Sequence, residues 1–332
     1  MSCTKTIPIS LPQGIGNNVP QLSLDYNSMA GNGIMGVGWS IGGTSAISRT
    51  GKTIYHDGYV EGVKFDINDN FLFDGNRMLS VNSNTYTTEV EEFVKISVME
   101  QNANGPVWFE VRAKNGKILR YGETTNSRQK LEGTENIISW RLNSVEDLAG
   151  NMITYEYELK QGNLLLKRVN YGGNSKTGQE HIYEIIYNYT DSRIDPYSSY
   201  INGSAIITNC LLEDISIQYV PTGQALFTYI FEYDITAKIF TRLDKVSIRD
   251  EKNQIGYNPT SIGWGQSTDN FNFEPTNIAP KPGFTADRTL GDFNGDGKTD
   301  VLLAFYSYIG STANLVESSI QKARLIFIVK YL

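Results

Sequence analysis

Apolar and polar residues alternate with a period of two over several stretches of this chain. In residues 153–159, apolar and aromatic side chains occupy the odd positions, and threonine or glutamate occupies the even ones. Residues 183–189 and 227–233 repeat the pattern, and residues 215–219 carry a shorter copy. Because a period of two places neighbouring side chains on opposite faces, these stretches predict strands with one buried face.

Pairs of Asn or Asp followed by Gly lie between the predicted strands. Such pairs accept the positive φ angles that the tight turns of antiparallel hairpins require. They occur at residues 32–33, 57–58, 74–75, 104–105, 115–116 and 202–203. No amphipathic helix of ten residues is recognisable before Gly263. The sequence therefore predicts an all-β fold, with many short antiparallel strands in a sandwich or shell-like domain.

Residues 31–43 are dense in glycine and enclose Trp39. Glycine at this density indicates backbone with unusual φ and ψ angles, or backbone packed closely against another segment. A phosphate-binding loop is the alternative, but such a loop opens a helix and no helical period follows here. We expect a structural role for these glycines.

Three prolines, Pro275, Pro280 and Pro282, lie in a segment with little alternation. Proline stiffens a chain and interrupts strand pairing, so this segment is predicted to be a linker. The predicted organisation is a β domain over residues 1–273, a linker over 274–286 and a third part over 287–332. Residues 311–332 of that third part match neither the preceding region nor a second calcium repeat, although Leu315, Ile320 and Ala323 suit a short helix and residues 325–329 suit a strand.

The charge balance limits the classes of partner. The 332 residues carry a formal net charge of −7, with an isoelectric point near 5.1. Nucleic acids and anionic membrane surfaces bind basic faces, so neither is expected as a partner. No run of eighteen apolar residues is present. The two cysteines, Cys3 and Cys210, are expected to be free thiols, with one long-range disulfide as the alternative.

Residues 292–300 form the one stretch in which oxygen donors recur at a spacing that suits a metal ion. The predicted ligands are the side chains of Asp292, Asn294, Asp296 and Asp300, and the backbone carbonyl of Lys298. A set of oxygen donors without His or Cys selects Ca²⁺. An EF-hand would carry Glu at the twelfth position, where this chain has Leu303, and residues 301–305 resemble a strand. We therefore expect a structural calcium loop between two strands, the alternative being an ordinary turn without an ion.

Two blocks of sequence carry a family likeness. The first comprises residues 7–33 with the glycine–tryptophan segment 36–41 and residues 47–49; the second comprises residues 138–140, 147–157 and 166–172. They resemble the SpvB-like domain, which opens the Salmonella virulence plasmid B protein and the B component of insecticidal toxin complexes. The resemblance spans about residues 7–270. Residues 292–300 in turn resemble the calcium loop of an FG-GAP repeat, the unit of a β-propeller, and only one such loop is present.

The resemblance implies a function. Members of this family build a β shell together with a partner that carries Rhs/YD repeats, and residues 147–169 are similar to one YD repeat. It also implies an ADP-ribosyltransferase activity in a separate C-terminal domain that uses a Glu-x-Glu pair. Glu89/Glu91 and Glu156/Glu158 match those letters but are expected to be solvated carboxylates. His56 and His181, the only histidines, are expected to be structural.

These observations predict a non-enzymatic structural β-scaffold of a bacterial toxin-complex or Rhs-type protein. Its predicted partner is an Rhs-repeat or toxin-complex protein, and Ca²⁺ is its predicted structural ion. The alternatives are a surface or secreted module that binds a host ligand or glycan, and a hydrolase with an unidentified site. No signal peptide is recognisable at the start. We expect the chain to be secreted or at the cell surface within a larger bacterial protein, or cytoplasmic before release.

Overall fold

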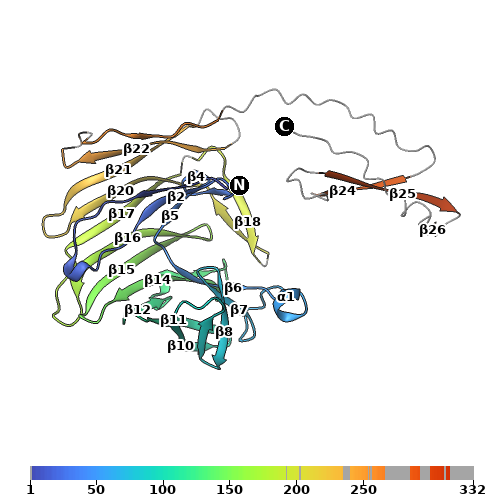
Figure 1. Ribbon diagram of the computed structural model, residues 1–332, viewed down its shortest axis with the longest axis horizontal. Coiled ribbons are helices and arrows are strands. Elements are labelled where there is room, and N and C mark those ends of the chain that lie inside the picture. The colour runs from blue at the N-terminus through green and yellow to red at the C-terminus, as the bar shows by residue number, and fades with distance from the viewer. Residues whose placement is uncertain are drawn as a thin grey trace. The chain divides into compact units, whose positions relative to one another are not determined.

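The computed structural model describes residues 2–265, apart from 192, 202, 235–239, 253 and 255, and also residues 285–291, 300–309 and 312–314. The chain divides into two compact units, Met1–Trp264 and Gly265–Leu332. In the described residues, strands dominate both units (Figure 1). The helical elements described are α1 (Ile54–Asp57) and two short 3₁₀ turns, Ile15–Asn17 and Thr125–Ser127. The prediction of an all-β fold is confirmed.

Eight strands of the first unit close into an antiparallel barrel. They are β6 (Ala46–Thr50), β7 (Asn70–Phe73), β8 (Asn76–Asn82), β9 (Thr85–Thr88), β10 (Val94–Asn102), β11 (Gly105–Ala113), β12 (Ile118–Tyr121) and β14 (Ile137–Glu146). Closure depends on β14, where Trp140 pairs with Ile47 of β6 and Val145 pairs with Leu119 of β12. The short β13 (Arg128–Lys130) pairs with the start of β14. Closure satisfies the backbone groups that an open sheet edge would expose.

Aromatic side chains fill the barrel interior. The ring of Trp140 lies edge-on to Phe109 at 5.0 Å and to Phe71 at 5.7 Å between ring centroids. The indole Nε1–H of Trp140 donates to the Val107 carbonyl over 2.9 Å. All three rings are almost completely buried. A small barrel filled by its own side chains is a packed core rather than a channel.

An open antiparallel sheet continues from β14 (Figure 1). Its further strands are β15 (Asn151–Lys160), β16 (Asn163–Asn174), β17 (Tyr183–Thr190), β20 (Leu211–Tyr219), β21 (Gln224–Asp234), β22 (Arg242–Asp250) and β23 (Thr260–Ser261). The predicted alternation is confirmed on β15, where Ile153, Tyr155 and Tyr157 are buried. Leu159 differs, because it lies at the strand end and is 51% exposed.

A three-stranded sheet of β1 (Thr4–Pro8), β2 (Ser23–Asn27) and β5 (Trp39–Gly42) packs against the open sheet. Hydrogen bonds join the two layers: the Ser10 N–H donates to the Tyr229 hydroxyl over 2.8 Å, and the Tyr171 hydroxyl donates to the Pro12 carbonyl over 3.0 Å. Two short hairpins, β3 (Asn32–Gly33) with β4 (Gly36–Val37) and β18 (Tyr197–Ile201) with β19 (Ser204–Thr208), complete the described part of this unit.

The turn predictions hold only in part, because the predicted turn pair Asn32-Gly33 is strand β3 itself. Asp74 and Gly75 both have positive φ and join β7 to β8 as a two-residue hairpin. Gly43 has φ +80°, and a Cβ there would lie 1.7 Å from the Gln21 carbonyl oxygen, so close packing explains the glycine-dense passage. Asp57-Gly58 is not a hairpin turn. Gly58 is instead the left-handed residue that ends α1.

In the second unit the described strands form a three-stranded antiparallel sheet, β24 (Thr285–Gly291), β25 (Asp300–Ile309) and β26 (Thr312–Asn314). The pairing of Gly291 with Asp300 shows that β24 and β25 are the two arms of a hairpin. Residues 292–299 connect these arms and lie outside the described residues, as do residues 274–284 of the predicted linker. The start of a propeller is not shown by this sheet and stays a prediction.

Candidate functional site

The connection between β6 and β7, residues 51–69, is much longer than the hairpin turns of the barrel and carries α1. Figure 1 shows α1 projecting beside β6 and β7. Lys52 at the start of the connection holds Glu61 near its middle. The Lys52 N–H donates to the Glu61 carbonyl over 2.8 Å, and the two side chains form an ion pair of 2.8 Å. Long connections on a rigid barrel commonly carry binding residues, which makes this connection a candidate location for a site.

A buried ion pair fixes the end of this connection. The Arg49 guanidinium on β6 lies 2.6 Å from the Asp69 carboxylate, and both side chains are almost inaccessible to solvent. Arg49 also donates to the Ile137 carbonyl over 2.8 Å and lies over the Trp140 ring at 5.4 Å. Burial lowers the pKa of Arg49, while the hydrogen bond with Asp69 acts in the opposite direction. Because each of its three guanidinium nitrogens donates to a neighbouring oxygen, Arg49 is a structural anchor.

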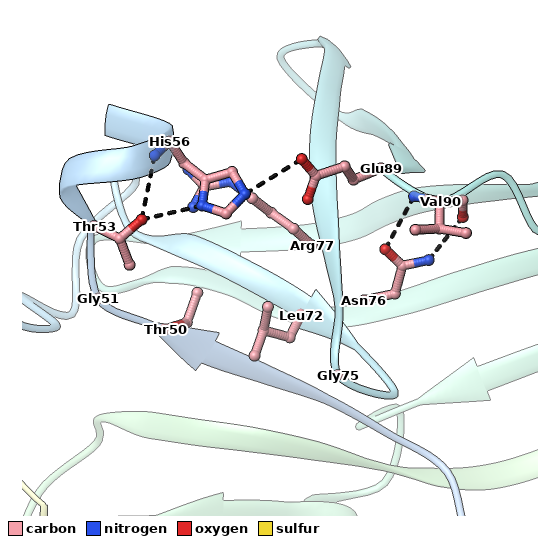
Figure 2. Close-up of a pocket in the computed structure, with 10 residues that line it drawn as sticks. All are labelled: Thr50, Gly51, Thr53, His56, Leu72, Gly75, Asn76, Arg77, Glu89 and Val90. Carbon is pink, nitrogen blue, oxygen red and sulfur yellow. Dashed lines mark hydrogen bonds and ion pairs between the residues drawn. The ribbon is translucent and has the colours of Figure 1, made fainter. Parts of the chain in front are cut away.

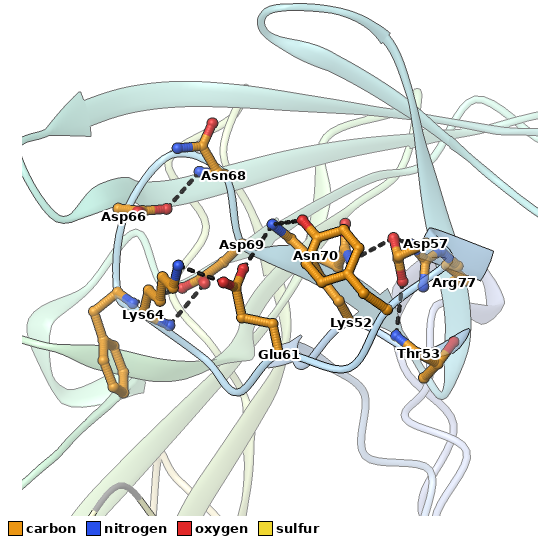
Figure 3. A network of polar contacts seen from close by, with 12 residues as sticks. Lys52, Thr53, Asp57, Glu61, Lys64, Asp66, Asn68, Asp69, Asn70 and Arg77 are labelled. Atoms are coloured by element: carbon orange, nitrogen blue, oxygen red, sulfur yellow. Dashed lines mark hydrogen bonds and ion pairs between the residues drawn. The ribbon is translucent and has the colours of Figure 1, made fainter. Parts of the chain in front are cut away.

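The Asp57 carboxylate ties α1 to the barrel (Figure 3). It accepts from the Thr53 N–H over 2.8 Å, from the Arg77 guanidinium over 2.6 Å and from the Asn70 amide over 3.2 Å. The Thr53 N–H, followed by Arg77, holds the pKa of Asp57 below its ordinary value. Asp57 and Arg77 therefore form a matched pair of charges on the outer face of β7 and β8.

A surface pocket of about 470 Å³ lies between α1 and the turn that follows β9. Figure 2 shows Thr50 and Leu72 on the barrel strands below His56, with Glu89 and Val90 on the opposite side. The complete lining is Thr50, Gly51, Thr53, His56, Leu72, Gly75, Asn76, Arg77, Glu89 and Val90. Its floor is apolar and its rim is polar, which is the usual composition of a ligand site.

His56 joins the two sides of the pocket. Its Nδ1 lies 3.0 Å from the Thr53 hydroxyl oxygen, and its Nε2 lies 3.3 Å from the Glu89 carboxylate. This geometry suits an imidazole whose Nδ1 accepts the hydroxyl proton while the Nε2–H donates to Glu89. His56 was expected from the sequence to be structural, and its contact with Glu89 was not predicted. The two residues are far apart in the sequence, and no pattern linked them.

The Glu-x-Glu pairs do not form a shared site. Glu89 lines the pocket, but the Glu91 carboxylate accepts from the Phe93 N–H over 2.6 Å and is not part of the lining. On β15, Glu156 accepts from the Asn170 amide over 3.1 Å and Glu158 pairs with Lys167 at 3.0 Å. These contacts fit the expectation of solvated structural carboxylates.

His181 lies just before β17 in a half-buried position, and its Nε2 is 3.4 Å from the Thr154 hydroxyl. The tryptophans Trp39 and Trp140 belong to the core. Cys3 is exposed, Cys210 is buried, and both are free, which confirms the expected thiols.

The predicted calcium ligands Asp292, Asn294, Asp296 and Lys298 lie outside the described residues. Asp300 begins β25, and the structure describes its backbone alone. Within the part of the chain that the structure describes, no cluster of His, Cys, Asp and Glu has the arrangement of a metal site. The calcium site therefore stays a prediction.

The family described as "Salmonella virulence plasmid 65kDa B protein" matches residues 2–236 of this chain. The chain belongs to this SpvB family. Mono(ADP-ribosyl)transferase SpvB of Salmonella typhimurium is 22% identical to it over 259 residues, and that of Salmonella choleraesuis is 23% identical over 262 residues. Each alignment covers 70% of this chain and 39% of the relative. The chain thus matches about two fifths of the length of these curated relatives.

Solved structures share the fold. The N-terminal domain of effector protein SpvB from Salmonella typhimurium strain LT2 aligns with a TM-score of 0.62 at 20% identity, over 74% of this chain and 98% of that one. The toxin complex TcdB2-TccC3 aligns with a TM-score of 0.69 at 16% identity, over 94% of this chain and 20% of that one. The structural neighbours of this SpvB family member are therefore an effector domain and toxin-complex components.

These comparisons correct the function predicted from the sequence. The prediction of a non-enzymatic scaffold is wrong as a description of the family's function, because the curated relatives are named as mono(ADP-ribosyl)transferases. It arose because the strand pattern, the glycines and the histidines showed no catalytic arrangement. The prediction used the residues of this chain alone, and the chain matches only 39% of the length of these relatives.

None of the helices in the described residues is long and apolar enough to cross a membrane.

Proposed function

We propose that this chain forms the amino-terminal part of a bacterial mono(ADP-ribosyl)transferase effector, and that another part of the same protein performs the transfer. The observation that carries this proposal is the alignment with the N-terminal domain of effector protein SpvB, which covers 98% of that domain. The 39% coverage of the full-length transferases supports the same division of the protein. The single lining carboxylate of the His56 pocket offers no Glu-x-Glu pair, which also supports it.

The test compares this chain with the complete natural gene product. Each is incubated with biotin-labelled NAD⁺ and a eukaryotic cell lysate, and biotin transferred to protein is measured. We expect transfer by the complete gene product and none by residues 1–332. Absence of transfer by the complete product contradicts the proposal. Transfer by residues 1–332 that is lost in Glu89→Gln also contradicts it, because the chemistry would then lie in this chain.

A protein partner from a toxin complex follows as a second proposal. The alignment with TcdB2-TccC3, over 94% of this chain, favours a partner of the Rhs-repeat class and a secreted effector. Co-expression with an Rhs-repeat toxin-complex protein, followed by size-exclusion chromatography, tests the association. We expect the two proteins to elute together at a mass equal to their sum, and separate elution contradicts the proposal.

A further inference from the structure

We propose that the pocket beside His56 binds a basic side chain, arginine or lysine, with its aliphatic stem on the apolar floor and its charged head at Glu89. This site goes beyond the proposed transferase effector and does not depend on it. The inference rests on the shape of the floor, on the balance of charge at the rim and on the unused hydrogen-bonding capacity of Glu89 (Figure 2).

The floor suits an aliphatic stem. Leu72 lies between Phe71 and Phe73 on β7, whose side chains point into the barrel, so Leu72 faces outward into the pocket. Gly51 and Gly75 contribute no side chains, which leaves the floor open. Val90 at the rim is 70% exposed. Lysine and arginine cover such apolar surface with their methylene groups while the charged head stays at the polar edge.

The rim is short of positive charge. Arg77 is matched by Asp57 at 2.6 Å, so this pair adds no net charge. The turn that carries Glu89 also carries Glu91 and Glu92, and neither of these forms an ion pair with a described residue. Since the whole chain is also acidic, with a net charge of −7, the pocket favours a cation over an anion.

Glu89 has capacity for a further donor. Its contact with the His56 Nε2 measures 3.3 Å, which is longer than the roughly 2.7–2.9 Å of a charge-assisted hydrogen bond. That contact uses Oε1, and no donor among the described residues contacts Oε2. The side chain is 42% exposed, so a ligand can reach it. A guanidinium can donate two hydrogen bonds to one carboxylate, and an ammonium can donate one or more.

The first experiment compares two ligands that differ in charge. Nα-acetyl-arginine amide and its citrulline analogue, which has nearly the same shape without the charge, are titrated into the 332-residue chain while the His56 ring signals are followed by NMR. We expect saturable binding of the arginine compound and about fivefold weaker binding of the citrulline compound, because the carboxylate is partly solvated. Equal binding of the two compounds, or no saturable binding of either, overturns the proposal.

The second experiment compares two carboxylates of the same turn. Glu89→Gln is expected to weaken binding of the arginine compound about fivefold, whereas Glu91→Gln leaves it unchanged because Glu91 does not line the pocket. Circular dichroism confirms that both variants fold. An equal loss in both variants indicates general surface charge and overturns the site. Neither result depends on transferase activity or on a protein partner, so failure here is separate from failure of the proposed function.

Discussion

Single glycines set how closely the amino-terminal segments approach one another. Gly43 and Gly58 have similar positive φ angles, of +80° and +76°, but different surroundings. A Cβ at Gly43 would overlap the Gln21 carbonyl, whereas a Cβ at Gly58 would meet no atom within 4 Å. Alanine variants at these two positions therefore distinguish the cost of backbone strain, which both share, from the cost of steric overlap, which only Gly43 would add.

We predict that Gly58→Ala lowers the free energy of unfolding by about 1 kcal/mol, from backbone strain alone. Gly43→Ala is expected to lower it by about 2–4 kcal/mol, because overlap adds about 1–3 kcal/mol to that strain. Urea unfolding followed by tryptophan fluorescence measures both variants. Equal effects would contradict the assignment of Gly43 to close packing.

Two buried tyrosines of the open sheet, Tyr157 on β15 and Tyr187 on β17, differ in one hydrogen bond. The Tyr157 hydroxyl donates to the Leu142 carbonyl over 2.7 Å, whereas the Tyr187 hydroxyl has no partner among the described residues. We predict that Tyr157→Phe destabilises the chain by about 1–2 kcal/mol, while Tyr187→Phe is neutral or stabilising because it removes a buried unpaired hydroxyl. Urea unfolding compares the two variants, and a larger loss for Tyr187→Phe would reverse this interpretation.

At the residue scale, sequence patterns identified core positions better than site positions. Tyr155 and Tyr157 were recognisable because burial on one strand face leaves a period of two in the sequence. The contact of His56 with Glu89, and the pairing of Arg49 with Asp69, depend on how the barrel closes. Such contacts leave no periodic trace, so the sequence did not predict them.

At the scale of elements, the connection from β16 to β17 contains a histidine whose charged form is disfavoured. The His181 Nδ1 is buried without a partner among the described residues, and its Nε2 faces the Thr154 hydroxyl. Burial lowers the pKa of His181, and the carboxylates of Glu180 and Glu156 oppose the shift. The folded chain therefore binds a proton at His181 less readily than the unfolded chain.

We predict that stability decreases on acidification from pH 7.5 to 5.5. Between the lowered folded pKa and the ordinary histidine value of about 6.5, the unfolded chain binds more protons, so the unfolding free energy falls as the pH falls through this window. His181→Gln should reduce that decrease. Thermal unfolding at pH 7.5, 6.5 and 5.5 tests this expectation, which fails if His181→Gln keeps the full dependence.

The strands themselves were predictable, but their closure into a barrel was not. Asp74-Gly75 located the β7–β8 hairpin from its turn chemistry alone. The pairing of β6 with β14 joins Ile47 to Trp140, and local alternation carries no information about a partner so distant in the sequence. Where the sequence predicted a sandwich or shell-like domain, the structure has a closed barrel that continues into an open sheet, and the sheet of β1, β2 and β5 packs on that open sheet.

At the scale of the whole molecule, the hairpin of β24 and β25 provides a test of the predicted calcium site. We propose that Asp292, Asn294, Asp296, Asp300 and the Lys298 carbonyl bind Ca²⁺ between these two strands. An ion that binds the folded state alone stabilises it by mass action, so millimolar Ca²⁺ should raise the melting temperature above its value in excess chelator. Asp296→Ala should abolish that difference. Calorimetry measures it, and an unchanged melting temperature contradicts the site.

The sharing of β14 between the barrel and the open sheet has a mechanical consequence. Ser144, Val145 and Glu146 pair with β12 on one side and with β15 on the other. Any force that pulls the barrel strands apart is therefore transmitted directly into the hydrogen-bond ladder of the sheet. Neither part can detach as an independent body while this strand is in place. The first unit should consequently resist partial unzipping and yield in one abrupt step when it is stretched.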